Sequence, residues 1–171
     1  MDTTVSENQK TLSAFIHVST FLKYFFPFAN FFAPLLLWST NKEKPFVDVH
    51  GKQAINFQLS VLLYTLIIGL LCLPFFLLFA SDFIALIESI DHHWEESTFN
   101  EIENLTGYII LFCTVVTLLF GLFVLELYAV ISATMHAAKG EIYKYPLSIP
   151  FIKTNPEVPS ELNQSKNEHT N

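Results

Sequence analysis

The chain has 171 residues, of which 51% are hydrophobic and only 15% are charged, and its formal net charge at pH 7 is −7. This length allows one small domain, and a mean hydropathy of +0.42 with 18 phenylalanines is far from the composition of a soluble protein. All nine basic residues are lysine, and with an overall acidic balance this argues against nucleic acid as a partner.

The N-terminal residues 1–11 are a polar leader, which we expect to be poorly ordered. They have neither the positive charge nor the cleavage site of a secretory signal peptide. The two cysteines, Cys72 and Cys113, lie inside apolar runs. They are best interpreted as small apolar side chains rather than as a disulfide framework.

Residues 12–40 form the first hydrophobic stretch, which contains Pro27 and Pro34 with Asn30 between them. Each proline removes a backbone N–H and clashes with the preceding turn, so a straight helix is not expected. One interpretation, favoured here, is a long kinked helix that spans the membrane. The other is a helix–break–helix that enters and leaves on the same side, since each half is short for a complete span.

A second helix is predicted over about residues 49–80, with Asp48 as its N-cap. Residues 59–80 carry no charge and are long enough to cross a hydrocarbon core of about 30 Å. Polar side chains at spacings of 3, 4 and 4 share one face of this helix: Gln53, Asn56, Ser60 and Tyr64. Lipid cannot satisfy polar groups, so this face should meet protein, a partner or water.

The connection at residues 81–106 has seven acidic residues and no lysine. Apolar residues recur at spacings of 4, 3 and 4 within it, so an amphipathic helix on the membrane surface is expected there. His92 and Glu96 have a spacing that can suit a metal ion, but no further His or Cys supports a site. A solvated acidic loop is the simpler interpretation.

A third helix is predicted over about residues 107–136, with Glu126 as its one acidic residue, and the tail 153–171 has a composition typical of disorder. The lysines cluster in the first connection and after the third helix. The positive-inside rule therefore places these regions and the C-terminus in the cytoplasm, and the acidic loop outside. The side of the N-terminus depends on whether residues 12–40 span or re-enter.

Two groups of polar residues are the candidate sites. Asn30, Ser60 and Glu126 fall at similar depths in a three-span bundle, and one interpretation is a polar recess for an ion, headgroup or peptide. The favoured alternative is that such groups only hydrogen-bond between helices. A candidate surface at the inner interface consists of Asp48, His50 and Lys52. A helix cap with interface anchors would explain the same three residues.

Three motifs carry a resemblance to a known family: YFFPFANFFAPLLLW, PFVDVHGKQAINFQLS and GEIYKYPLSIPFI. Over about residues 12–152 the chain resembles uncharacterised small bacterial membrane proteins grouped with the twenty-kilodalton subunit of the chloroplast Tic protein-import translocon. The resemblance implies a helical membrane fold. It does not imply an activity.

The sequence thus predicts an all-α integral membrane protein with about three transmembrane helices, the first kinked or re-entrant at Pro27/Pro34. No nucleophile–base pair or cofactor motif is present, so a non-enzymatic role without cofactor or metal is expected. The favoured function is a subunit or scaffold of a membrane complex that assembles through the polar face of the second helix. The alternative is a transport or protein-translocation component with a recess near Glu126. Expected partners are membrane lipids and a membrane protein or a second copy, in the bacterial inner membrane.

Overall fold

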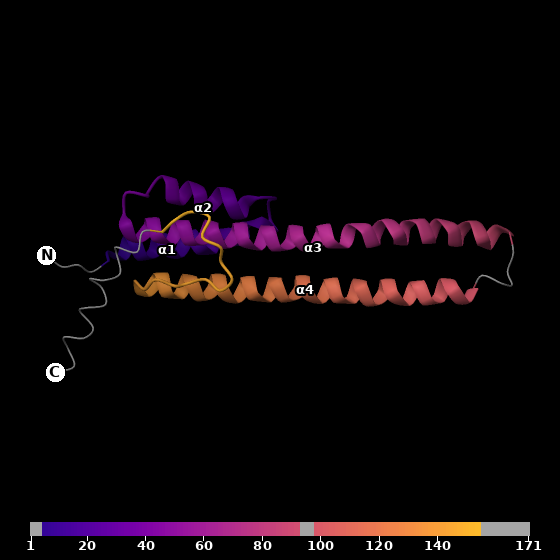
Figure 1. The fold of residues 1–171 in the computed structure, drawn as a ribbon. Helices are drawn as coiled ribbons and strands as arrows, with labels where there is room; N and C mark the ends of the chain where they lie inside the picture. Colours follow the sequence, from indigo (N-terminus) through magenta and orange to yellow (C-terminus); the bar gives the residue numbers. More distant parts are fainter. Residues whose placement is uncertain (1–4, 93–97, 155–171) are drawn as a thin grey trace, which may run out of the picture. The chain divides into compact units, whose positions relative to one another are not determined.

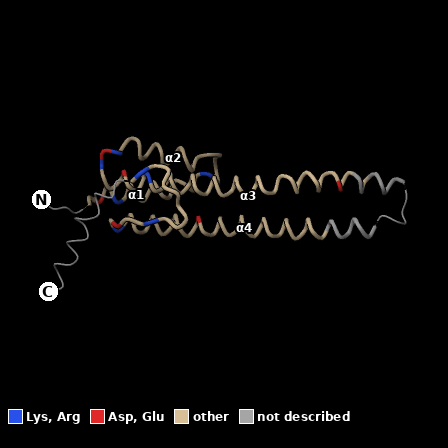
Figure 2. The backbone as a smooth tube through the Cα atoms, in the orientation of Figure 1, with Lys and Arg blue, Asp and Glu red and all other residues tan. Residues whose placement is uncertain are grey.

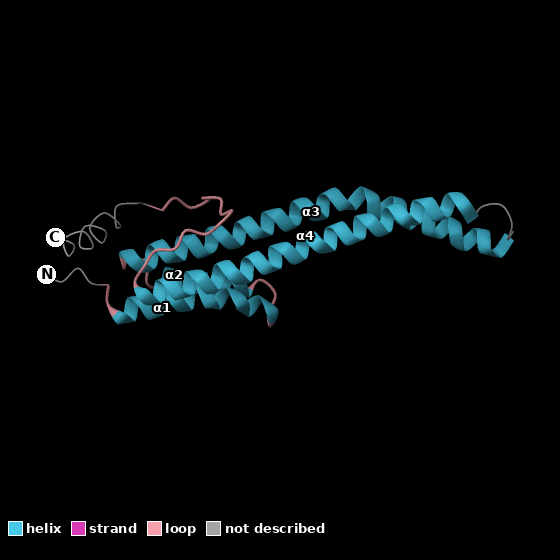
Figure 3. Ribbon diagram, turned by 90° about the horizontal axis from the view of Figure 1, so that it is seen from below, coloured by secondary structure: helices cyan, strands magenta, loops and turns pink. Residues whose placement is uncertain are grey.

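The computed structural model describes residues 5–92 and 98–154, and for 85–86, 88–92 and 98–105 it describes the backbone only. Five helical elements occur in these ranges, and no strand is found among them (Figure 3). They are α1 (Glu7–Val18), the 3₁₀ helix η1 (Ser19–Tyr24), α2 (Ala29–Ser39), α3 (Pro45–His92) and α4 (Thr98–Lys139). The all-helical prediction is therefore confirmed for the described residues.

Residues 12–40 do not form the favoured kinked span. They fold as a helical hairpin in which α2 runs back beside α1 and η1 (Figure 1), which is the helix–break–helix alternative. The break lies at residues 25–28, where Phe28 adopts a left-handed conformation with φ of 61°. Pro27 lies in this turn, whereas Pro34 is accommodated inside α2. The chain therefore reverses at Pro27, because proline lacks the N–H that would continue the helix.

The two long helices differ in their limits from the prediction. α3 begins at Pro45, a residue suited to the first helical position, so Asp48 lies in the first turn and is not the N-cap. The backbone of residues 81–92 continues α3, and that of residues 98–106 continues α4. A separate surface helix in the 81–106 connection was therefore the wrong expectation, and residues 93–97 lie outside the described ranges.

Among the described residues, two helices are long and apolar enough to cross a membrane: Pro45–Ile84 and Thr106–Lys139. The most apolar stretch of each is not buried inside the protein. This exposure is the pattern of lipid-facing helices, since the core helix of a soluble protein would be covered. The three-span count is not confirmed, because α2, the return arm of the hairpin, has only 11 residues, about 17 Å of helix rise.

The chain divides into two compact units. The first comprises the described residues up to Val61 and from Leu125 onwards, and the second is Leu62–Val124. In the second unit the two helices meet through the rings of Phe79 and Tyr108, 5.2 Å apart, and the Tyr108 hydroxyl donates to Asp82. Among the charged residues whose side chains the structure describes, all but Asp82 belong to the first unit (Figure 2).

The C-terminal end of α4 turns the chain back over the first unit. Gly140 has φ of 82°, and the Glu141 N–H donates to the His136 carbonyl, which closes the helix in the left-handed manner that glycine allows. Residues 141–154, called here the C-terminal strap, follow as a non-helical segment. The strap returns over α3 and covers part of it.

Gly51 permits the close packing of α2 on α3. A Cβ atom at this position would lie 2.4 Å from the ring of Trp38. We expect Gly51→Ala to lower the free energy of unfolding by about 1–3 kcal/mol, since overpacking forces a bulky neighbour to move. Thermal unfolding in mild detergent, followed by circular dichroism, measures this loss.

Gly69→Ala is the matched control in the same helix, because nothing lies within 4 Å of the added atom. It should leave the melting temperature unchanged or slightly raised, as alanine is the better helix former. Equal melting temperatures for the two variants would contradict the packing role of Gly51.

Candidate functional site

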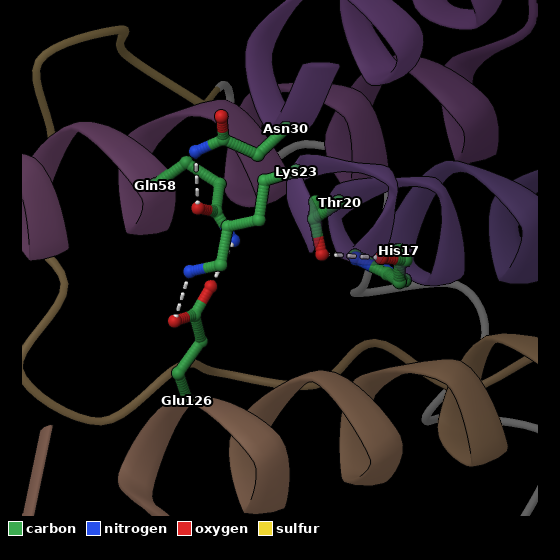
Figure 4. A network of polar contacts seen from close by, with 6 residues as sticks. All are labelled: His17, Thr20, Lys23, Asn30, Gln58 and Glu126. Atoms are coloured by element: carbon green, nitrogen blue, oxygen red, sulfur yellow. Dashed lines mark hydrogen bonds and ion pairs between the residues drawn. The ribbon is translucent and has the colours of Figure 1, made fainter. Parts of the chain in front are cut away.

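Glu126 of α4 is the centre of a buried polar network in the first unit. Its side chain is only 3% exposed, and it forms an ion pair with Lys23 of η1. The Gln58 amide of α3 donates to the other carboxylate oxygen at 3.1 Å, and Asn30 of α2 donates to the Gln58 carbonyl at 2.9 Å (Figure 4). Two side chains thus bind the carboxylate directly, and Asn30 extends the network through Gln58, so four elements are joined. Both of its oxygens are engaged.

The polar face of α3 is occupied by the chain's own strap. The Asn56 side-chain amide donates to the Ile152 carbonyl and accepts from the Ile152 N–H, both at 2.8 Å. The Ser60 hydroxyl accepts from the Ile149 N–H at 2.8 Å and donates to the Asn56 carbonyl. Asn56 therefore pairs with the strap as a neighbouring peptide unit would. These polar side chains supply hydrogen-bond partners to backbone groups of the strap, which is not helical.

A second buried chain of hydrogen bonds links α1, α3 and the strap. The Tyr145 hydroxyl lies 2.8 Å from Nδ1 of His17, and Nε2 of His17 lies 2.8 Å from Nδ1 of His50. The Tyr145 ring stacks on Phe57 with centroids 4.3 Å apart. Burial raises the pKa of Tyr145 well above its usual range.

The residues of the predicted inner-interface surface, Asp48, His50 and Lys52, lie in different environments. Asp48 accepts from the Trp38 indole N–H at 2.9 Å and from Lys52 at 2.5 Å, so these groups are paired within the chain. His50 is fully buried among aromatic rings, with Nε2 unpartnered in the part of the chain described. Asp48 and Lys52 are half-buried and His50 faces the core. The three share a helix but not an environment.

The predicted polar face of α3 is brought together only in part. Asn56 and Ser60 meet the strap, whereas Gln53 is half-buried and its Oε1 finds no partner among the described atoms. Tyr64 belongs to the second unit. Asn30 and Glu126, expected at one depth, are joined through Gln58, which lies on another side of the helix.

The candidate sites predicted from the sequence leave out four residues of these networks: Gln58, Lys23, His17 and Tyr145. One signal was available for the ion pair. Lys23 is the one cation in residues 12–40 and Glu126 the one acid in residues 107–135. A charged side chain within an apolar stretch costs free energy unless it is paired, so two opposite charges in such stretches are expected to form an ion pair. Gln58 gave no such signal, since an amide in an apolar helix has many possible partners.

Comparison with known proteins gives the family of the chain. Residues 8–152 match the magnetosome magnetite crystal formation protein family. The chain belongs to this family. Neither the curated proteins nor the solved structures that were compared contain a match. The predicted relationship to the Tic import subunit gains no support, and the family together with the two apolar helices supports a membrane location.

The described side chains of this magnetosome-family protein contain no group of three or more His, Cys, Asp or Glu that could hold a metal ion. The His92–Glu96 pair lies outside the described side chains. The network around Glu126 joins elements instead of presenting free groups. Its chemistry is that of interhelical hydrogen bonding.

Glu126→Gln should destabilise the first unit, since it leaves the Lys23 ammonium without a counter-charge. Breaking a buried pair costs about 3–5 kcal/mol, and we expect about 2–3 kcal/mol here because the Lys23 side chain is 23% exposed. Unfolding in mild detergent measures the change. The double variant Lys23→Met, Glu126→Gln should recover part of the loss, because the charge is removed together with its partner.

Glu141→Gln is the control for this pair. Its carboxylate is half exposed and 3.9 Å from His136, so its removal should cost less than about 1 kcal/mol. Additive losses for Lys23→Met and Glu126→Gln would show that the two residues do not interact.

Proposed function

We propose that this protein is a non-enzymatic membrane subunit or scaffold that supports magnetite crystal formation in the magnetosome. The observation that carries the proposal is the closure of the Glu126 network, in which carboxylate, ammonium and amide groups bind one another. Groups used in this way position helices, and the Glu126 carboxylate and the Lys23 ammonium are bound to each other.

The place of assembly is a surface other than the polar face of α3. Asn56 and Ser60 are covered by the strap, so a partner meets the protein elsewhere. The lysine-bearing turn after α2 and the strap lie on the cytoplasmic side in this proposal, and the acidic connection lies on the opposite side. With two crossings, both termini are cytoplasmic.

A specific feature favours a second part to this function. The segment 81–106 carries seven carboxylates and no lysine, and carboxylate oxygens are hard ligands suited to iron ions. The family description names magnetite crystal formation. We assign this segment to contact with iron ions or the mineral surface, as substrate.

The scaffold proposal is tested by removing the buried charges without breaking the fold. The double variant Lys23→Met, Glu126→Gln, placed in cells that lack the native copy, should restore magnetite crystals as the native chain does, because the network only holds the helices. Crystal number and size are measured by electron microscopy. The scaffold role would be contradicted if crystals were lost while the amount of membrane-inserted protein and its melting temperature stayed normal. That result would indicate chemistry at the carboxylate.

The acidic segment is tested by converting six of its acids to amides. Asp82 is left unchanged because it accepts the Tyr108 hydrogen bond; the replaced residues are Glu88, Asp91, Glu95, Glu96, Glu101 and Glu103. We expect smaller or fewer crystals at an unchanged amount of membrane-inserted protein, because the carboxylates that attract iron are gone. The control converts Glu7, Glu43 and Glu141, which lie in the first unit. Equal crystals in both variants would exclude the assignment.

A further inference from the structure

The hairpin of α1, η1 and α2 exposes large apolar side chains along both arms and at its turn. Phe15 and Leu22 are exposed before the turn, and Phe32 and Leu36 after it. Within the turn, Phe25 is 77% and Phe26 is 68% exposed. Soluble surfaces do not carry aromatic groups at this density without a partner.

The polar side chains of the hairpin are turned inward or satisfied locally. The hydroxyls of Ser19 and Thr20 donate to carbonyls three residues earlier, at 2.7 and 2.8 Å. Lys23 is bound to Glu126, and Asn30 to Gln58 (Figure 4). The outward side of the hairpin is therefore left to hydrocarbon side chains.

The backbone of the turn is also largely satisfied from within. The N–H groups of Phe25 and Phe26 donate to the Leu22 carbonyl, and that of Ala29 donates to the Phe26 carbonyl. Pro27 has no N–H to satisfy. Hydrocarbon tolerates only backbone whose polar groups are paired. This turn can enter a lipid phase where an ordinary loop could not.

The hairpin is too short to cross, and its ends are polar. The return arm limits its depth, because α2 has 11 residues and rises about 17 Å, against a hydrocarbon core of about 30 Å. Near its ends His17 contacts His50 and Trp38 contacts Asp48, whereas near the turn Asn30 contacts Gln58. The turn thus lies farther along α3, by about 12 Å of helix rise.

Charges mark the two ends of the hairpin. The Glu7–Lys10 ion pair lies at the start of α1, and Lys42, Glu43 and Lys44 follow α2. Figure 2 shows both groups at the same end of the first unit, away from the turn. Charged residues at the two ends of the hairpin and aromatic residues at its turn are typical of an element that enters a membrane from one side.

We infer that the hairpin is a re-entrant membrane element: it enters one leaflet from the lysine-bearing side, turns at residues 25–28 and returns without crossing. The occupant of its exposed side is the acyl chains of that leaflet. The same chain supplies two helices that are long and apolar enough to cross a membrane and whose most apolar stretches are not buried inside the protein, so acyl chains are the surroundings that this chain offers the hairpin. This inference does not depend on the scaffold role.

The depth of the turn is the first test, made on the full-length chain with Cys72 and Cys113 changed to serine. A fluorescent NBD label at Phe26→Cys, reconstituted in phosphatidylcholine–phosphatidylglycerol vesicles, should lose fluorescence to lipids brominated in mid-chain and resist aqueous iodide. Thr40→Cys, exposed at the end of α2, is the control and should show the opposite. Phe25→Cys repeats the tip measurement, and unchanged melting of each variant confirms the fold.

The sidedness of the hairpin is the second test. Asn8→Cys and Glu43→Cys, both exposed, are treated with a membrane-impermeant maleimide in right-side-out and in inside-out vesicles. Both should be labelled in the same preparation and protected in the other. Labelling in opposite preparations would establish a crossing and overturn the inference.

Two results at the tip would also overturn it. Quenching of Phe26→Cys by iodide and not by bromolipid would place the hairpin in water. Protection from both quenchers, with disulfide formation between two copies at this position, would show that a second copy covers the hairpin in place of lipid.

Discussion

The buried carboxylate of Glu126 is the constraint on which the arrangement of the first unit depends. An ionised acid among apolar helices is costly unless it is paired and hydrogen-bonded. Lys23 supplies the charge and Gln58 the second hydrogen bond. Because these two residues come from η1 and α3, satisfying one acid on α4 fixes where the hairpin and the start of α3 must lie. Asn30 extends the same requirement to α2.

The strap obeys the same rule for backbone groups. A non-helical segment laid on an apolar helix would leave its N–H and carbonyl groups without partners. Asn56 offers Ile152 both a donor and an acceptor, and Ser60 takes the Ile149 N–H. Polar residues at the entry of α3 are thus explained by the chain's own C-terminal segment. Tyr145 adds a buried ring and a hydroxyl contact to His17.

The motif that suggested an import-related family has a structural meaning of its own. In PFVDVHGKQAINFQLS, Asp48 accepts a hydrogen bond from Trp38, and Gly51 leaves room for the same ring. Asn56 binds the strap, and Gln58 binds Glu126. These residues are used for packing and hydrogen bonding, so their pattern indicates a fold and does not indicate an activity. The match to a magnetosome family fits this division. The proposals for function therefore concern the acidic segment and the exposed apolar faces.

Composition and periodicity alone determined that the chain is helical and belongs in a membrane, because long charge-free stretches permit few other structures. They also singled out Asn30, Asn56, Ser60 and Glu126 as groups that lipid cannot satisfy. Only the tertiary structure decided which partner satisfies each of these groups. Gln58 binds Glu126, which lies 68 residues away in the sequence. The strap binds Ser60 through Ile149, which lies 89 residues away. It also decided that residues 12–40 turn back, since a break at Pro27 permits either a kink or a reversal. The contacts of Lys23 and Asn30 with other helices select the reversal.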